Sequence, residues 1–300
     1  MSFYKNWMSY IRDDAKITRI AMPGSHNSAT MAMNKFACCQ KGTLYEQYCY
    51  GLRMFDIRLK ANKKGELVVA HGVMNGISAE RAFLDLKRII DETDEFIIIG
   101  LRTYMNQKIG PVKLSYDGNS AETSRLIRTC LNPEKYALTD ISDIANLTLG
   151  DIRKSGKKYI IINENAEYDY SVNCPMPYPW ESDVYGYKPE KFAKTILKYF
   201  DEVESEGFFA FQTQQTPNPG TENGWTKWPD DLDEMIRPFI PQIVSDIAAN
   251  PRWLEKVNII VGDFMTKDYM KTNEILSLNL LKGIVKDELK EEFAKAIGKS

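Results

Sequence analysis

Short apolar runs alternate along the chain with longer segments whose apolar residues recur at helical spacing. The apolar runs are residues 17–22, 52–59, 66–70, 96–101, 158–163, 208–212 and 257–262. Each run is about as long as a strand and apolar enough to be buried on both faces, as in a parallel sheet covered by helices. Parallel strands need crossovers, which the segments between the runs can supply.

The intervening segments predict amphipathic helices. They are residues 78–93, 119–131, 188–206, 230–250 and, as a closing helix, 274–297. Pro238 and Pro241 should kink or break the fourth of these helices, because proline cannot donate a helical hydrogen bond. Residues 173–189 are rich in proline and aromatic side chains, and we predict that they form one long loop over the mouth of the fold.

This alternation predicts an α/β fold, namely a (β/α)8 TIM-type barrel that is irregular or incompletely closed. The glycine-rich turns GxGxxG and GxxxxGKS/T, which are typical of doubly wound nucleotide-binding sheets, follow none of the runs. No clear eighth strand stands out in the pattern, hence the expected irregularity. We find no linker and expect residues 1–300 to form a single barrel domain.

Composition says more about partners than about the fold. The 300 residues are 43% hydrophobic and 27% charged, which is enough for a sizeable core. With 39 basic and 41 acidic residues the net charge is -2, so nothing in the charge favours nucleic acid as a partner. We therefore expect no nucleic-acid partner, and we expect a monomer.

Neither a targeting signal nor a metal motif is visible in the chain as written. It does not begin with a basic segment followed by an apolar one, and it lacks a run of about 18 apolar residues, so we expect no secretion signal and no membrane span. The compartment stays open between the cytoplasm and secretion after removal of a signal. The five cysteines form neither a disulfide framework nor a metal knuckle, so we expect free thiols and no bound metal.

Polar side chains with catalytic potential stand at the ends of the apolar runs. In a (β/α) barrel, active-site residues come from the carboxyl ends of the strands and the loops that follow. The residues at those ends are His26, Asp56, Arg58, His71, Arg102, Asn163, Glu164 and Asp263. Both histidines of the chain belong to this set, which favours a catalytic role for them over a purely structural one.

Two imidazoles and a guanidinium are suited to cleaving a phosphodiester. A neutral imidazole can remove the proton of an attacking hydroxyl, and a protonated one can donate to the departing oxygen, because both forms exist near neutral pH. The planar fork of an arginine can contact two phosphoryl oxygens at once and neutralise their charge. A metal ion is redundant in such a scheme.

Three ordered motifs resemble a known family. AMPGSHNSAT (21–30), GLRMFDIRL (51–59) and LVVAHG (67–72) are similar to the X domain of the phosphatidylinositol-specific phospholipases C of bacterial type. That family has a PG(S/T)H(D/N)S signature, an FDIR strand and an HG turn in this order. FIIIGLR (96–102) and VNIIVGDF (257–264) are further matches. Three motifs in the right order are a more specific signal than any one of them.

The resemblance implies a role for each matching residue. His26 would be the general base that deprotonates the inositol 2-hydroxyl, and His71 the general acid that protonates the diacylglycerol oxygen. Arg58 would take the place of calcium beside the phosphate, and Asp263 would orient and polarise His26. Arg102 matches a basic residue near the inositol. The products would be diacylglycerol and a cyclic inositol phosphate, with no cofactor.

Asn27 departs from the bacterial pattern, in which aspartate usually follows the first histidine and supports the general acid. An amide cannot hold an imidazole protonated by charge, so His71 should titrate lower or rely on a carboxylate such as Asp56. The fifth and sixth strand ends, INEN (162–165) and FQTQQ (211–215), lack the Arg and Asp expected to hold inositol hydroxyls. The expected substrate is therefore a modified inositol lipid, a glycosylated one, or another phosphodiester with a neighbouring hydroxyl.

Two alternatives stay open. One is a calcium-assisted phosphodiesterase that uses Asn27, Asp56 and Glu164, since Asn at this position is typical of the calcium-dependent branch of the family. That branch has an acidic ligand where this chain has Arg58, which disfavours calcium. The other is a catalytically lapsed module that binds inositol lipids.

Trp225 and Trp228 stand in a polar loop, where large amphipathic rings suit a lipid interface. The loop therefore predicts either a peripheral membrane contact or ordinary packing of these rings against the protein.

Overall fold

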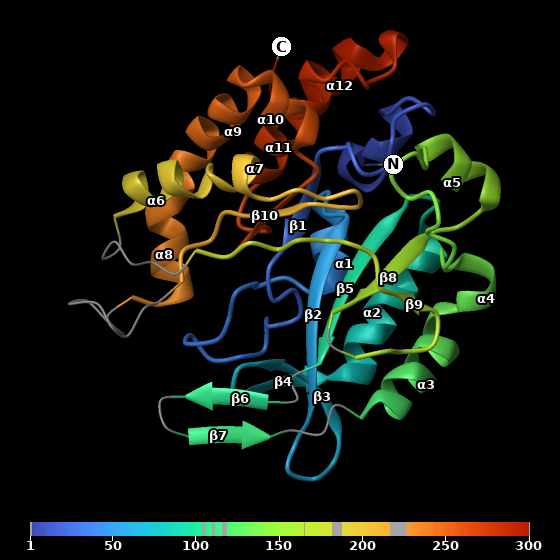
Figure 1. The fold of residues 1–300 in the computed structure, drawn as a ribbon, viewed down its shortest axis with the longest axis vertical. Coiled ribbons are helices and arrows are strands. Elements are labelled where there is room, and N and C mark those ends of the chain that lie inside the picture. Colours follow the sequence, from blue (N-terminus) through green and yellow to red (C-terminus); the bar gives the residue numbers. More distant parts are fainter. Residues whose placement is uncertain are drawn as a thin grey trace.

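A curled sheet occupies the centre of the molecule, with helices on both sides of it (Figure 1). The computed structural model describes residues 2–103, 106–109, 112–115, 119–164, 166–181, 188–216 and 227–299. The strands are β1 (Met22–Ser25), β2 (Met54–Ala61), β3 (Leu67–His71), β4 (Met74–Ser78), β5 (Ile97–Thr103), β6 (Asn106–Ile109), β7 (Val112–Ser115), β8 (Tyr159–Asn163), β9 (Ser171–Val172), β10 (Ala210–Gln212) and β11 (Ile259–Gly262). Along the sheet they follow the order β10, β11, β1, β2, β5, β8, β9, and each neighbouring pair is parallel.

The helices cover the outside of this sheet. They are α1 (Leu44–Cys49), α2 (Ala79–Glu92), α3 (Ser120–Leu131), α4 (Pro133–Tyr136), α5 (Leu149–Ser155), α6 (Pro189–Ile196), α7 (Tyr199–Glu202), α8 (Pro229–Ile236), α9 (Ile240–Ala249), α10 (Pro251–Lys256), α11 (Met270–Leu281) and α12 (Lys290–Ala296). In Figure 1, α2 to α5 lie on one side of the sheet and α6 to α10 on the other, α12 lies beyond one end of the sheet near the N-terminus, and the β6–β7 hairpin projects from the opposite end. Among the described residues, no helix is both long enough and apolar enough to cross a bilayer.

Alternate residues of each strand enter two different cores, because successive side chains of a strand point to opposite faces. The residues that point into the barrel pack in one buried cluster, which includes Met54, Ile98, Ile160, Ile162, Ala210, Ile259 and Val261. The residues between them pack against the helices in a second cluster, which includes Phe55, Ile57, Ile97, Ile99, Ile161, Phe211 and Ile260. Trp7, Met8, Phe293 and Ile297 belong to the inner cluster and close its amino-terminal end.

The barrel closes through a proline-rich seam rather than a full strand pair. Beyond β9, the carbonyls of Pro175 and Pro177 accept hydrogen bonds from the backbone N–H groups of Phe208 (2.9 Å) and Ala210 (3.0 Å). In a parallel ladder the return bonds would come from the N–H groups of the residues two positions further on, which are Pro177 and Pro179. Proline has no N–H, so the seam has only half of its ladder. The prediction of an incompletely closed barrel is confirmed, and this is its physical cause.

The expected place of the run 66–70 in the barrel is wrong. It forms β3, which pairs antiparallel with β2 and with β4 instead of following a helical crossover. The connection between β2 and β3 is too short for a parallel pair, which needs a crossover of about a dozen residues or more. Instead, the pattern missed the short strand β9, which extends the sheet beside β8.

Three predicted elements differ in extent. The run 17–22 contributes only Met22 to β1. The segment 188–206 divides into α6 and α7, and 274–297 divides into the end of α11 and α12. Gly283, at a φ of 66°, lies between the last two helices in a conformation that glycine adopts at little cost.

Other predictions from the pattern are confirmed. The segments 78–93 and 119–131 form α2 and α3, and the helical segment 230–250 breaks at Pro238, between α8 and α9. All five cysteines have free thiols.

Candidate functional site

The carboxyl ends of the strands surround a polar pocket of about 400 Å³. Four of the residues singled out from the sequence line it: His26 after β1, Arg58 in β2, His71 at the end of β3 and Arg102 in β5. The remaining lining residues are Gly72, Tyr178, Trp180, Gln212 and Thr216. The structure therefore brings both histidines and two arginines to one opening.

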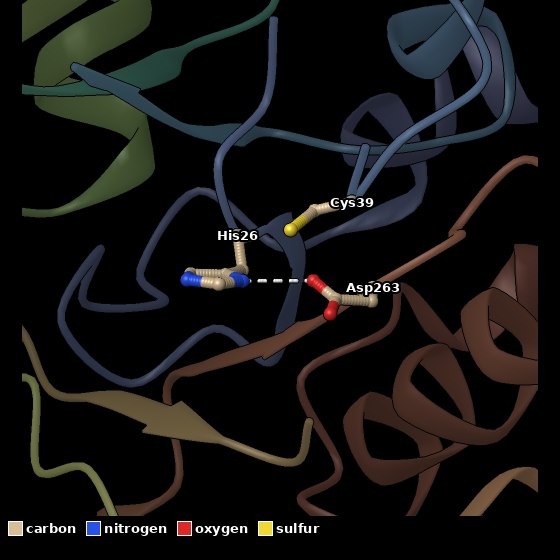
Figure 2. Close-up of side chains that lie close together, drawn as sticks. All are labelled: His26, Cys39 and Asp263. Carbon is tan, nitrogen blue, oxygen red and sulfur yellow. Dashed lines mark hydrogen bonds and ion pairs between the residues drawn. The ribbon is translucent and has the colours of Figure 1, made fainter. Parts of the chain in front are cut away.

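His26 and Asp263 face each other because their strands are neighbours in register. Ser25 of β1 lies opposite Gly262 of β11, so the next residue of each strand falls at the same level. His26 Nδ1 lies 2.8 Å from Asp263 Oδ1. The dashed line in Figure 2 marks this hydrogen bond. A carboxylate only accepts, so Nδ1 holds the proton and Nε2 keeps the lone pair that a general base needs. Burial raises the pKa of Asp263, and the neighbouring His26 opposes that shift.

Asn27 holds the turn that presents His26. Its φ is 45°, in the left-handed region where Asn is tolerated better than most residues. Its backbone N–H donates to Asp56 Oδ2 (3.1 Å), and its side-chain nitrogen lies 3.0 Å from His26 Nε2. The Asn27 amide thus contacts His26, whereas the family pattern assigns this position to support of His71.

Asp56 lies between two arginines at the inner face of the sheet. Arg58 of β2 stands directly opposite Arg102 of β5, an unfavourable pairing for like charges. Arg58 Nη2 donates to Asp56 Oδ2 (2.7 Å), and Arg102 Nε is 3.8 Å from Asp56 Oδ1. Burial alone would raise the pKa of Asp56, but Arg58 and Arg102 outweigh it and hold the pKa well below its usual value. The carboxylate is therefore ionised and fixes the Arg58 guanidinium.

Glu164 joins this network from the next strand. It follows β8 and forms an ion pair with Arg102, whose guanidinium also lies over the Tyr178 ring, 4.7 Å from its centre. Burial raises the pKa of Glu164, and Arg102 opposes the shift. Asn163, by contrast, points to the other face of the sheet, where its amide donates to Ser171 Oγ (2.9 Å).

His71 approaches His26 from the β3–β4 hairpin. The two rings are 6.2 Å apart between centres and nearly perpendicular, at 82°. His71 Nδ1 lies 2.8 Å from the Ala37 carbonyl, which only accepts, so Nδ1 holds a proton in every charge state. Burial lowers the pKa of His71 to about 4, with a further contribution from the nearby Arg58 charge.

A second, more apolar hollow of about 330 Å³ adjoins the polar pocket and shares His26, His71, Gly72 and Thr216 with it. Its other lining residues are Phe36, Ala37, Cys39, Val73, Met74, Gln215, Pro229 and Asp263. Phe36 is 49% exposed and Val73 is 44% exposed. The Trp228 ring meets Phe36 edge-on at 4.3 Å, while Trp225 lies outside the described residues. We call Phe36, Val73 and Trp228 the apolar rim.

The loop predicted to lie over the mouth of the fold brings Tyr178 and Trp180 into the lining of the polar pocket. Sequence reasoning missed Cys39, which comes from the loop after β1 and does not follow from strand periodicity. Gln212 could have been found, because it continues the inward-facing alternation of Ala210 in β10.

The similarity of this chain to known proteins agrees with the motifs. No family model matches it. The 1-phosphatidylinositol phosphodiesterase of Staphylococcus aureus (strain Newman) is 29% identical over 125 residues, which cover 40% of this chain and 37% of that protein. A PI-PLC X-box domain-containing protein of Dictyostelium discoideum is 26% identical over 119 residues, or 32% of this chain and 16% of that protein. The chain thus matches well under half of each relative's length.

Solved structures match over most of the chain. The phosphatidylinositol-specific phospholipase C of Listeria monocytogenes superposes with a TM-score of 0.65 at 19% identity, covering 92% of this chain and 98% of that one. A variant of the Staphylococcus aureus enzyme superposes with a TM-score of 0.64 at 18% identity, covering 92% and 97%. The chain therefore has the fold of these bacterial phospholipases, and the resemblance indicated by the three motifs is confirmed.

Proposed function

We propose that the protein is a phospholipase C that cleaves phosphatidylinositol-type lipids. The observation that supports this most directly is the placement of His26, His71 and Arg58 around one pocket, each on the element that its motif predicts. The similarity of the chain to 1-phosphatidylinositol phosphodiesterase, over 125 residues, points to the same reaction.

The reaction proceeds by intramolecular attack. His26 Nε2 takes the proton of the inositol 2-hydroxyl, which replaces the Asn27 amide as its neighbour, and Asp263 stabilises the imidazolium that forms. The inositol oxygen bonds to phosphorus, and the bond from phosphorus to the glycerol oxygen breaks. Protonated His71 gives its proton to that oxygen. The products are diacylglycerol and a cyclic inositol phosphate.

Arg58 neutralises the phosphate charge that increases as the bond breaks. Its guanidinium is held by Asp56, so it needs little reorganisation when the transition state forms. Arg102, Tyr178, Gln212 and Glu164 line or border the same pocket, where they contact the polar head group. Asn27 acts through His26 and through its bond to Asp56.

We propose that this site works without a metal. The calcium-assisted alternative requires Asp56 and Glu164 as ligands, yet arginine guanidinium groups contact both carboxylates. A calcium ion there would have to displace Arg58 and Arg102, or bind beside their positive charges.

The apolar rim supports membrane contact beside the active site. Phe36 and Val73 expose apolar surface next to His71, and Trp228 packs against Phe36. Such a surface suits shallow insertion into a lipid interface, which would bring the pocket to its substrate. We expect the protein to act there as a monomer.

Phosphorus NMR on phosphatidylinositol micelles in EDTA tests the proposal, with His71→Ala as the control. The wild-type protein should produce a cyclic phosphodiester resonance that His71→Ala does not produce at a comparable rate. Activity that disappears in EDTA and returns with calcium would overturn the metal-free scheme. Binding of inositol lipid without any turnover would favour the lapsed binding module.

A further inference from the structure

Cys39 lies at the hydrogen bond between His26 and Asp263, although the proposed reaction does not use it. Figure 2 shows its sulfur beside that bond. One ligand atom from each of His26, Cys39 and Asp263 can be chosen so that all three lie within 4.8 Å of one another. All three residues also line the 330 Å³ hollow, so a small ion has a route to them.

The chain holds this cluster in place through its backbone. The Cys39 N–H donates to Thr30 Oγ1 (2.9 Å), and the Cys39 carbonyl accepts from the N–H of Phe264 (2.8 Å), the residue after Asp263. The Cys39 and Asp263 segments are therefore tied together independently of the side chains. A metal needs only small side-chain movements to be bound.

We propose that His26, Cys39 and Asp263 form a binding site for Zn²⁺ or a similar soft divalent cation, and that occupation of this site inhibits the enzyme. A thiolate, an imidazole and a carboxylate are typical zinc ligands, whereas calcium and magnesium prefer sets made of oxygen alone. Three protein ligands leave a fourth position for water from the hollow. The inhibition rests on the proposed function; the metal site does not.

Metal binding changes which nitrogen of His26 is protonated. Cys39 releases its thiol proton, the metal bonds to Sγ, to His26 Nδ1 and to the Asp263 carboxylate, and the proton of Nδ1 moves to Nε2 through solvent. One proton leaves overall. Nε2 then has a hydrogen instead of a lone pair, so His26 cannot accept the substrate proton.

Asn27 can accommodate this second state. Its Oδ1 is buried and has no hydrogen-bond partner among the described residues, while its nitrogen faces both His26 Nε2 (3.0 Å) and Cys39 Sγ (3.5 Å). Rotation of the amide by half a turn would place Oδ1 against the new Nε2–H. The orphaned acceptor would thereby gain a donor.

Cobalt(II) spectroscopy tests the site without reference to activity. Co²⁺ added to the reduced wild-type protein should give a thiolate charge-transfer band and the intense visible bands of a tetrahedral site. Cys39→Ser and Cys39→Ala should abolish the charge-transfer band. Cys38→Ser is the matched control, because the Cys38 thiol faces the Gln40 carbonyl instead (3.3 Å) and its loss should leave the band intact.

Zn²⁺ titration by calorimetry gives the second readout. We expect one ion per chain and an affinity that rises about tenfold per pH unit, because one proton is released. Cys39→Ser should weaken Zn²⁺ binding by at least about 100-fold, the upper end of what loss of an outer-shell partner costs. Circular dichroism melting confirms that each variant folds.

The outcomes separate the metal site from the activity. A cobalt spectrum without a thiolate band, or a band that survives in both Cys39 variants, would overturn the site. A thiolate band in a protein that lacks phospholipase activity would leave the site intact and refute the proposed function instead. Full activity with Zn²⁺ bound at one equivalent would overturn the inhibition.

Discussion

Asp56 shows how one buried carboxylate organises the reactive groups around it. It accepts hydrogen bonds from the Arg58 side chain and from the Asn27 backbone, and it lies close to Arg102. Its negative charge therefore offsets the repulsion between Arg58 and Arg102, which the sheet register places face to face. Its bond to the Asn27 backbone also fixes the turn after β1. A single side chain thus supports both Arg58, which we propose contacts the phosphate, and the segment that presents His26.

Asp56→Asn should therefore destabilise the fold as well as slow the reaction. The amide keeps the shape of the side chain but removes the charge between Arg58 and Arg102. Breaking a buried ion pair from one side costs about 3 kcal/mol, which urea denaturation would measure as a loss in the free energy of unfolding. If the free energy of unfolding falls by less than about 1 kcal/mol, this ion pair contributes no more than an exposed salt bridge does.

The pKa of His71 should determine the pH profile of the proposed reaction. Burial lowers this pKa to about 4, so His71 is mostly neutral in the free protein above that pH. If His71 is the general acid, its protonated fraction shrinks as pH rises, and kcat/KM, which reports the free enzyme, must decline toward alkaline pH. On the acidic side, kcat/KM should rise with pH and level off near pH 4, the pKa of His71. An ordinary imidazole would place that point near about pH 6.5 instead.

His71→Ala is the matching control for this profile. The residual activity of the variant should show no alkaline decline, because no acid remains to be deprotonated. In the wild-type protein, the apparent pKa values in the pH profile of kcat should be higher than those in the profile of kcat/KM. The reason is that a bound phosphodiester anion favours the imidazolium form. An identical alkaline decline in both proteins would remove His71 from the role of general acid.

At the scale of elements, the seam between the segment 175–179 and β10 determines how well the barrel closes. Its prolines accept hydrogen bonds but cannot return them. The same segment places Tyr178 and Trp180 at the pocket, and the Gln212 amide donates to the carbonyls of Tyr178 (2.9 Å) and Pro179 (3.0 Å). One wall of the pocket therefore depends on a weak closure.

Gly207→Ala tests this dependence. A Cβ at Gly207 would overlap the backbone oxygen of Pro175, so the seam must shift. We expect a loss of about 1 to 3 kcal/mol in the free energy of unfolding, as for overpacking, together with a raised KM. Gly156→Ala is the control: its positive φ of 68° makes alanine unfavourable, but nothing lies within 4 Å of its Cβ. Equal KM values for both variants would show that the seam does not position the pocket wall.

The sequence could predict the parts of the site that belong to barrel strands. Apolar runs followed by polar residues placed His26, Arg58, Arg102 and Asp263 at the same end of the sheet, since parallel strands share their direction. Local sequence patterns could not predict that β3 pairs antiparallel with β2, because pairing direction depends on connection length and on the partner strand. They also could not predict that Tyr178 contacts Arg102, because this contact depends on where a long loop packs.

At the scale of the whole molecule, the candidate active site and the apolar rim lie beside each other. The polar pocket and the apolar hollow share both histidines, and the hollow leads to Phe36 and Val73. The net charge of -2 gives no general attraction to anionic lipid, so apolar contact should provide most of the proposed membrane affinity.

Phe36→Ala should therefore weaken binding to phosphatidylcholine vesicles by about tenfold or more, since burying a Phe side chain contributes about 1.5 to 3 kcal/mol. Raising the salt concentration should change the affinity little. Leu84→Ala is the control, because Leu84 on α2 is similarly exposed, at 47% against 49% for Phe36, but does not line the hollow. Vesicle sedimentation measures both variants, and equal losses would argue against the apolar rim.

The alternation of the strands between two cores also bears on how such a pocket can diversify. Arg102, Glu164 and Gln212 continue the inward series of their strands, whereas the residues that anchor the helices stand at the intervening positions. Mutation can therefore change the chemistry of the opening while the layer that supports the helices keeps its sequence. In evolutionary terms, one barrel frame can accept new head groups through a few substitutions at strand ends.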